Sequence, residues 1–135
     1  MQLYEGYSHA LYNISVAKQD PVDYFQRYVA MLTHGWTITD SEGAYHMDLP
    51  LSRLVLGLGN GWAYNSGKFL FLESETIQSI YKGLSDAGLS PRGWMFWDIL
   101  DEGMPAGVEG KPFYMTKTLN QVMNIRQIVE APNDL

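Results

Sequence analysis

The chain lacks cysteine entirely, so it carries no disulfide, no thiolate nucleophile and no cysteine-ligated zinc site. Charged residues are scarce at 18%, and the 9 Lys and Arg form no cluster and are outnumbered by 15 Asp and Glu. A net charge of -6 without a basic patch argues against nucleic acid as a partner. No apolar run approaches the roughly 20 residues that span a bilayer, so we expect no membrane partner either.

Other patterns that would identify a function class are also absent. The N-terminus has no basic segment followed by an apolar stretch, so no signal peptide is visible. The histidines His9, His34 and His46 lack the spacing of metal ligands, and we expect neither a metal nor a cofactor. The glycine-rich segment 57–61 follows an apolar run but precedes no helix start, which argues against a dinucleotide site. The compartment stays open, because many secreted bacterial enzymes also lack cysteine.

What the chain does contain is apolar and aromatic. Hydrophobic residues make up 46% of it and aromatic residues 13%, including 4 Trp and 9 Tyr. This composition and the length of 135 residues fit one globular domain with one core. We assign most of the rings to the core and the remainder to ligand stacking. Because residues 1–4 read as a strand without a preceding arm or cap, we expect residues 1–135 to be a single truncated domain.

Strands and helices are expected to alternate along the chain. The first helix has Asp20 as its cap, Pro21 in its first position and Gly35 at its end, and the second has Ser74 as its cap and Gly88 as its stop. The expected strands lie at residues 1–4, 53–58 and 93–99, the helices at 21–34, 74–87 and 115–129, and a loop at 37–50. The expected apolar stripes are Val22, Phe25, Val29 and Leu32, then Ile77, Ile80, Leu84 and Ala87.

This alternation indicates an α/β fold with a parallel sheet and right-handed crossovers. A complete (β/α)8 barrel needs about 250 residues, so the chain is about half of one. We therefore expect a partial TIM (β/α)8 barrel, formed by three consecutive βα units with parallel strands.

The last expected strand carries the strongest functional signal. Its sequence Gly93-Trp94-Met95-Phe96-Trp97-Asp98-Ile99 sets two tryptophans beside a carboxylate and leads into the acidic turn Asp101-Glu102-Gly103. An aromatic ring stacks on the apolar face of a pyranose while an acid holds its hydroxyls, so this strand end indicates the floor of a sugar site. By period-two alternation Met95 shares the face of Trp97, whereas Trp94 and Phe96 point towards the helices.

Three strand motifs, taken in order, resemble the last three βα units of glycoside hydrolase family 18, the chitinase family. Met1-Gln2-Leu3-Tyr4-Glu5 is similar to the family's sixth strand, Leu51-Ser52-Arg53-Leu54-Val55-Leu56-Gly57-Leu58 to its seventh, and residues 93–99 to its eighth. The chain departs from the family at Glu5, Gly59, Asp98 and residues 100–102. The catalytic signature D-G-x-D-x-D-x-E, which ends in the general acid, occurs nowhere in the sequence.

The resemblance implies the C-terminal segment of a hydrolase acting on β-1,4-linked N-acetylglucosamine polymers, that is, chitin or chito-oligosaccharides. In this family the substrate's own acetamide attacks the anomeric carbon with retention, an exception to the two-carboxylate scheme. Tyr4 is implied as the catalytic hydrogen-bond donor to that acetamide, and the general acid would come from a missing N-terminal part. The isolated chain is then expected to be inactive and its parent secreted. The implied substrate-binding residues are Gln2, Trp97, Met95, Asp98 and Trp62.

Other interpretations stay open at this point. Tyr4 also fits a core tyrosine, Gln2 a buried amide, and the acids at 98–102 a solvated loop. Trp62 and Tyr64 fit either an outer sugar platform or separate loop aromatics. The whole chain also fits a non-catalytic, lectin-like remnant that binds chito-oligosaccharides. A third reading is a half-barrel that self-associates or pairs with its N-terminal half, because a three-stranded parallel sheet leaves two open edges.

Overall fold

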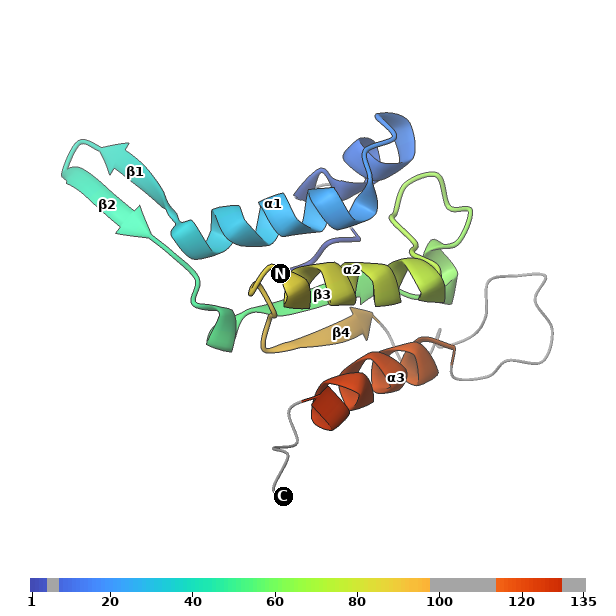
Figure 1. Ribbon diagram of the computed structural model, residues 1–135. Helices are drawn as coiled ribbons and strands as arrows, with labels where there is room; N and C mark the ends of the chain where they lie inside the picture. Colours follow the sequence, from blue (N-terminus) through green and yellow to red (C-terminus); the bar gives the residue numbers. More distant parts are fainter. Residues whose placement is uncertain (5–7, 98–113, 130–135) are drawn as a thin grey trace, which may run out of the picture.

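The structure, a computed structural model, describes residues 1–4, 8–97 and 114–129 of a mixed α/β chain (Figure 1). The described elements follow in the order η2 (Tyr12–Val16), α1 (Pro21–His34), β1 (Trp36–Asp40), β2 (Gly43–Met47), η3 (Leu51–Arg53), β3 (Val55–Gly59), η4 (Gly61–Ala63), α2 (Ser74–Asp86), β4 (Gly93–Trp97) and α3 (Tyr114–Val129). The expected α/β alternation is confirmed for β3, α2 and β4, which form one βαβ unit.

The central sheet is parallel. β3 and β4 pair in register from Val55 opposite Gly93 to Gly59 opposite Trp97. On the other side of β3, residues 1–4 run parallel to it but form a single bridge, between Gln2 and Gly57, instead of the expected strand. Three expected parallel segments therefore lie next to one another in chain order. No barrel closes within the described residues.

The helices lie side by side along this sheet, with α1 contacting α2 and α2 contacting α3 (Figure 1). Leu56 and Leu58 of β3 point into the core, as expected for a uniformly apolar strand. Trp94 of β4 also faces the helices, with its ring stacked on Phe25 at 6.2 Å between centroids. The larger side chains that share this core include Leu3, Phe25, Leu32, Leu56, Ile77, Ile80 and Leu84.

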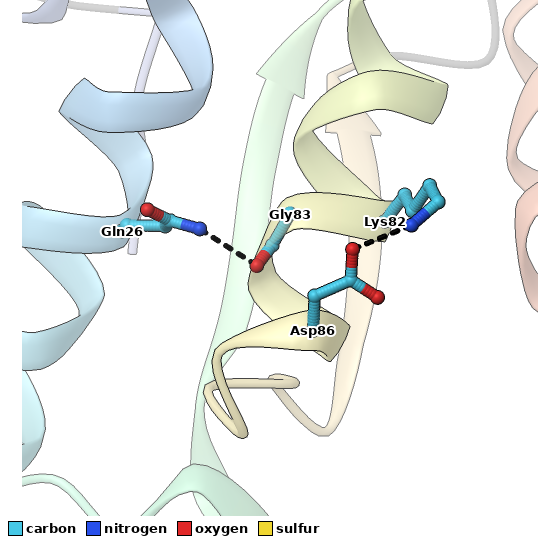
Figure 2. Close-up of polar contacts among 4 residues, drawn as sticks. All are labelled: Gln26, Lys82, Gly83 and Asp86. Atoms are coloured by element: carbon cyan, nitrogen blue, oxygen red, sulfur yellow. Dashed lines mark hydrogen bonds and ion pairs between the residues drawn. The ribbon is translucent and has the colours of Figure 1, made fainter.

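The two long helices approach each other closely at Gly83. A Cβ atom there would lie 2.3 Å from Cγ1 of Val22, so only glycine fits. Figure 2 shows Gln26 of α1 reaching across to donate a 2.8 Å hydrogen bond to the Gly83 carbonyl. The neighbouring ion pair between Lys82 and Asp86 is largely exposed and contributes little to stability (Figure 2). The Val22 side chain packed on Gly83 and one interhelical hydrogen bond therefore add to the shared apolar core in holding α1 against α2.

Local signals at the helix ends are mostly confirmed. Asp20 caps α1, because its Oδ1 accepts a 3.0 Å hydrogen bond from the Asp23 amide, and Pro21 is the first helical residue. The expected cap of α2 is wrong by one position. Ser74 is itself the first helical residue and Glu73 occupies the cap position. Ala87 was expected in the apolar stripe of α2, but it is exposed because the helix has ended at the preceding residue.

The loop expected over residues 37–50 is wrong. β1 and β2 form an antiparallel hairpin, which extends beyond the end of α1 (Figure 1). At its turn the Asp40 carboxylate accepts hydrogen bonds from the amides of Glu42 and Gly43, at 2.8 and 3.1 Å. Every residue of both strands is exposed. The hairpin therefore forms through its ladder and turn, without the buried face by which strands are usually recognised.

A buried tyrosine anchors the N-terminal segment to α1. Tyr24 donates a 2.5 Å hydrogen bond to the Ser8 carbonyl, and its ring stacks on Tyr28 at 5.8 Å. Burial, and to a lesser degree the neighbouring Tyr28, raises the pKa of Tyr24 to about 12, although the Ser8 side chain acts in the opposite direction. The folded state therefore holds this proton more tightly than the unfolded chain does.

Replacing Tyr24 by phenylalanine tests this anchor. Loss of the hydrogen bond to Ser8 is expected to lower the free energy of unfolding by about 1 kcal/mol at pH 7. The tyrosine's contribution is complete below its ordinary pKa of 10.0 and is lost as the pH rises from there towards about 12. Urea unfolding at pH 7 and pH 11 should show a smaller alkaline loss for Tyr24→Phe than for the wild type. Tyr12→Phe, at an exposed position, is the control, and equal alkaline loss in all three proteins would contradict the assignment.

Candidate functional site

The carboxyl ends of the three parallel segments meet at one edge of the sheet. Gly59 ends β3 opposite Trp97, which ends β4. On its other side, a Cβ atom at Gly59 would lie only 3.1 Å from Cβ of Tyr4. Tyr4, Gly59 and Trp97 therefore lie next to one another, as the parallel arrangement predicts. In open parallel sheets this edge is where ligands bind.

An aromatic cluster, formed by Tyr4, Trp62 and Phe69, covers part of this edge. The Trp62 ring meets Tyr4 edge-to-face at 5.7 Å and Phe69 at 4.8 Å. The indole N–H of Trp62 donates a hydrogen bond to the carbonyl of Trp97. The amide of Leu70 donates to the Tyr4 carbonyl at 3.1 Å, so the loop after β3 folds back over the strand ends. Tyr4 is consequently only 3% exposed.

An open face, formed by Gln2, Met95 and Trp97, lies on the side of the sheet away from the core. Met95 is 40% and Trp97 54% exposed, while Trp94 between them is buried. The predicted alternation along β4 is therefore confirmed. Gln2 is exposed as well, and not the buried amide that was one of its two readings. Gly57 lies opposite Met95, and a Cβ at Gly57 would make an ordinary van der Waals contact of 3.6 Å with Met95 Cγ.

The remaining predicted site residues fall elsewhere. Trp62 belongs to the aromatic cluster and is half-buried. Tyr64 instead packs edge-to-face on Phe71 at 5.4 Å, whereas the ring of Trp62 packs on Phe69. Asp98 and the acids Asp101 and Glu102 lie outside the described residues.

Sequence reasoning missed Phe69 and Phe71. Both line a cleft of about 540 Å³ between the loop after β3 and η2. The alternation in Phe69-Leu70-Phe71-Leu72 carried a usable signal, because Leu70 and Leu72 are buried while the two phenylalanines are half-buried. The segment forms no strand, and its alternation lies outside the elements that the sequence predicts.

The chemistry available at the open face is binding chemistry. Trp97 offers a ring for stacking, Met95 a polarizable thioether and Gln2 an amide that donates and accepts hydrogen bonds. None of the described residues in the open face or the aromatic cluster is a carboxylate or a histidine. Across the described ranges, no group of three or more His, Asp or Glu side chains is arranged to hold a metal ion. Within the same ranges no helix has the length and apolarity needed to cross a membrane.

Comparisons with models of protein families, with curated proteins and with solved structures found no match for this chain.

Replacing Gly59 by alanine tests the packing at the strand ends. The new methyl group would meet Cβ of Ala63 at 2.9 Å, the Leu70 carbonyl oxygen at 3.0 Å and Tyr4 at 3.1 Å. One of these atoms is a backbone oxygen and the other two are Cβ atoms, whose positions the backbone fixes, so we expect a loss of about 1–3 kcal/mol in unfolding free energy. Gly93→Ala is the matched control in the adjacent strand, because a Cβ there meets nothing within 4 Å. Urea denaturation that ranks both variants equally would refute the packing argument.

Proposed function

We propose that this chain is the C-terminal segment of a chitinase-like glycoside hydrolase and contributes part of its substrate site. The observation that carries the proposal is the parallel order of residues 1–4, β3 and β4, with Trp97 exposed at the end of the last strand. This order is what the sixth, seventh and eighth strands of a (β/α)8 barrel require. The mixed α/β architecture of the chain supports the assignment to part of such a barrel.

In this proposal Trp97 is the floor of the central sugar subsite. Its ring lies on the open face, where a pyranose can stack on it without any rearrangement. Gln2 and Met95 lie on the same face and would contact the sugar's hydroxyl and acetamide groups. Asp98 would follow directly in sequence as a further hydroxyl ligand.

Tyr4 is the proposed donor to the substrate's acetamide oxygen. Substrate-assisted hydrolysis proceeds through attack of that oxygen on the anomeric carbon, and a hydrogen bond from the phenol would orient it. Since Tyr4 is 3% exposed beside Trp62, an acetamide reaches its hydroxyl only after the aromatic cluster opens. Trp62 would then be both a cover for Tyr4 and a substrate contact.

The general acid would come from another part of the barrel. Protonation of the leaving oxygen and orientation of the acetamide both need carboxylates of the family signature, which this sequence does not contain. Chitin or chito-oligosaccharide is the proposed ligand. The rest of the barrel, or a second copy of the chain, would cover the open sheet edges.

A second candidate is a chito-oligosaccharide-binding module without catalysis. The exposed Trp97 and Met95 favour it, because stacking needs no acid. The coding sequence upstream of the codon for Met1 separates the two candidates. A D-G-x-D-x-D-x-E motif in the upstream reading frame would support the hydrolase segment, and an in-frame upstream stop codon would support the binding module.

Replacing Trp97 by alanine should weaken binding of an N-acetylglucosamine tetramer. Loss of one stacking ring, worth about 1 kcal/mol, corresponds to roughly a fivefold increase in Kd. Trp36→Ala removes another exposed tryptophan, in β1 of the hairpin, and should leave the affinity unchanged. Isothermal titration calorimetry of the three proteins makes the comparison. Equal affinities for wild type and Trp97→Ala would exclude Trp97 as the floor.

The chain by itself should not hydrolyse chitin-type substrates, because it contains no carboxylate of the family signature to protonate the leaving oxygen. Incubation of the purified chain with a chromogenic chitobioside is expected to release chromophore at the rate of buffer alone. Release above that rate, lost on further purification, would point to a contaminant. Release that persists and disappears in Trp97→Ala would overturn the assignment of the acid to another part of the barrel.

A further inference from the structure

A cleft of about 540 Å³ lies beyond the aromatic cluster, between the loop that follows β3 and the π-helix η2. Phe69 connects the two features, because it lines the cleft and also packs against Trp62. The cleft therefore lies on the carboxyl side of β3, but its walls are separate from the open face around Trp97. Its volume is that of a small-molecule site, large enough for a sugar ring.

The loop that forms one wall is held in shape by its own hydrogen bonds. The hydroxyl of Ser66 accepts from the amides of Lys68 and Phe69, at 3.2 and 3.0 Å, and lies 3.3 Å from the Phe69 carbonyl, to which it donates. Asn65 adopts a left-handed conformation with φ of 53°, which asparagine tolerates better than most residues. The wall is thus formed before any ligand arrives, and binding does not have to order it.

The lining combines aromatic surface with a single charge. Tyr64 and Phe71 meet edge-to-face at 5.4 Å and form an apolar corner, with hydroxyl and amide groups from Ser15 and Asn65 nearby. Among the residues that the structure describes, Glu73 is the only charged side chain that lines the cleft. It occupies the cap position before α2. Lys68 belongs to the same loop but lies outside the lining.

We infer that this cleft binds a ring-sized ligand carrying a protonated amine, namely an unacetylated glucosamine unit of a chitin-type chain. The aromatic corner suits a pyranose face and attracts a cation, and the Glu73 carboxylate pairs with the ammonium group. An acetylated unit offers no charge to this carboxylate, and an anionic ligand would be repelled. The choice of sugar rests on the proposed function, whereas the preference for an amine rests on the lining alone.

Nuclear magnetic resonance titration of the isotope-labelled chain tests the inference at pH about 6, where a primary amine is protonated. A glucosamine tetramer is expected to shift the amide signals of Ser15, Tyr64, Asn65 and Phe71. The N-acetylglucosamine tetramer should shift these signals at about fivefold higher concentration, the effect of losing one exposed ion pair. It should act first on the signals of Met95 and Trp97, if the proposed function holds.

Glu73→Gln should raise the Kd for the glucosamine tetramer by about fivefold and abolish the preference over the acetylated tetramer. Glu75→Gln is the matched control, since it removes the same charge one residue into α2 without touching the cleft. Tyr64→Ala should weaken the binding of both tetramers, with circular dichroism checking that the fold persists.

The inference is overturned if the cleft signals do not move, if they move equally for both tetramers, or if Glu73→Gln and Glu75→Gln behave alike. Ligand binding at the open face shifts the amide signals of Met95 and Trp97, and binding at the cleft shifts a separate set. Failure of the proposed function can therefore be told apart from failure of this inference.

Discussion

The close packing of backbone segments around Gly57 and Gly59 is the constraint on which the described structure depends. A Cβ atom on Gly57 would lie 3.1 Å from the Met1 carbonyl oxygen, and one on Gly59 would lie 2.9 Å from Cβ of Ala63. A side chain at either position would push β3 away from residues 1–4 or from the loop that follows it. Because Gly57 and Gly59 have no Cβ atom, β3 can lie close to residues 1–4 and to the loop that follows it. This close approach positions the aromatic cluster.

That spacing produces a sheet with two different faces. The helices bury Leu56 and Trp94 on one face, and hydrophobic burial there supplies most of the stabilisation. The opposite face carries Met95 and Trp97, which remain exposed in the described chain. Apolar surface that stays exposed beside a parallel sheet's carboxyl edge is surface available to a ligand or to another chain. The aromatic cluster contacts both proposed sites, because Trp62 donates to the carbonyl of Trp97 and Phe69 lines the cleft.

Local chemistry explains which elements the sequence predicted well. The α1 helix follows from an aspartate cap, a proline in the first turn and apolar residues every three or four positions, all of which act within a few residues. The hairpin had local signals too, namely alternation along residues 36–40 and the turn at Asp40. The hairpin forms through this ladder and turn although every residue of its two strands is exposed, so the prediction of a loop over residues 37–50 is wrong.

The sequence by itself determined the helices, the parallel β3–α2–β4 order and the side of β4 on which Trp97 lies. The helices follow from caps and from apolar stripes, the parallel order from the alternation of strands and helices, and the side of Trp97 from the two-residue period of a strand. Only the tertiary structure decided that Tyr4 is covered by Trp62 and that Phe69 and Phe71 line a cleft with Glu73. Those features arise because the chain after β3 turns back and donates a hydrogen bond from Leu70 to the Tyr4 carbonyl, a contact between distant residues that no local pattern encodes.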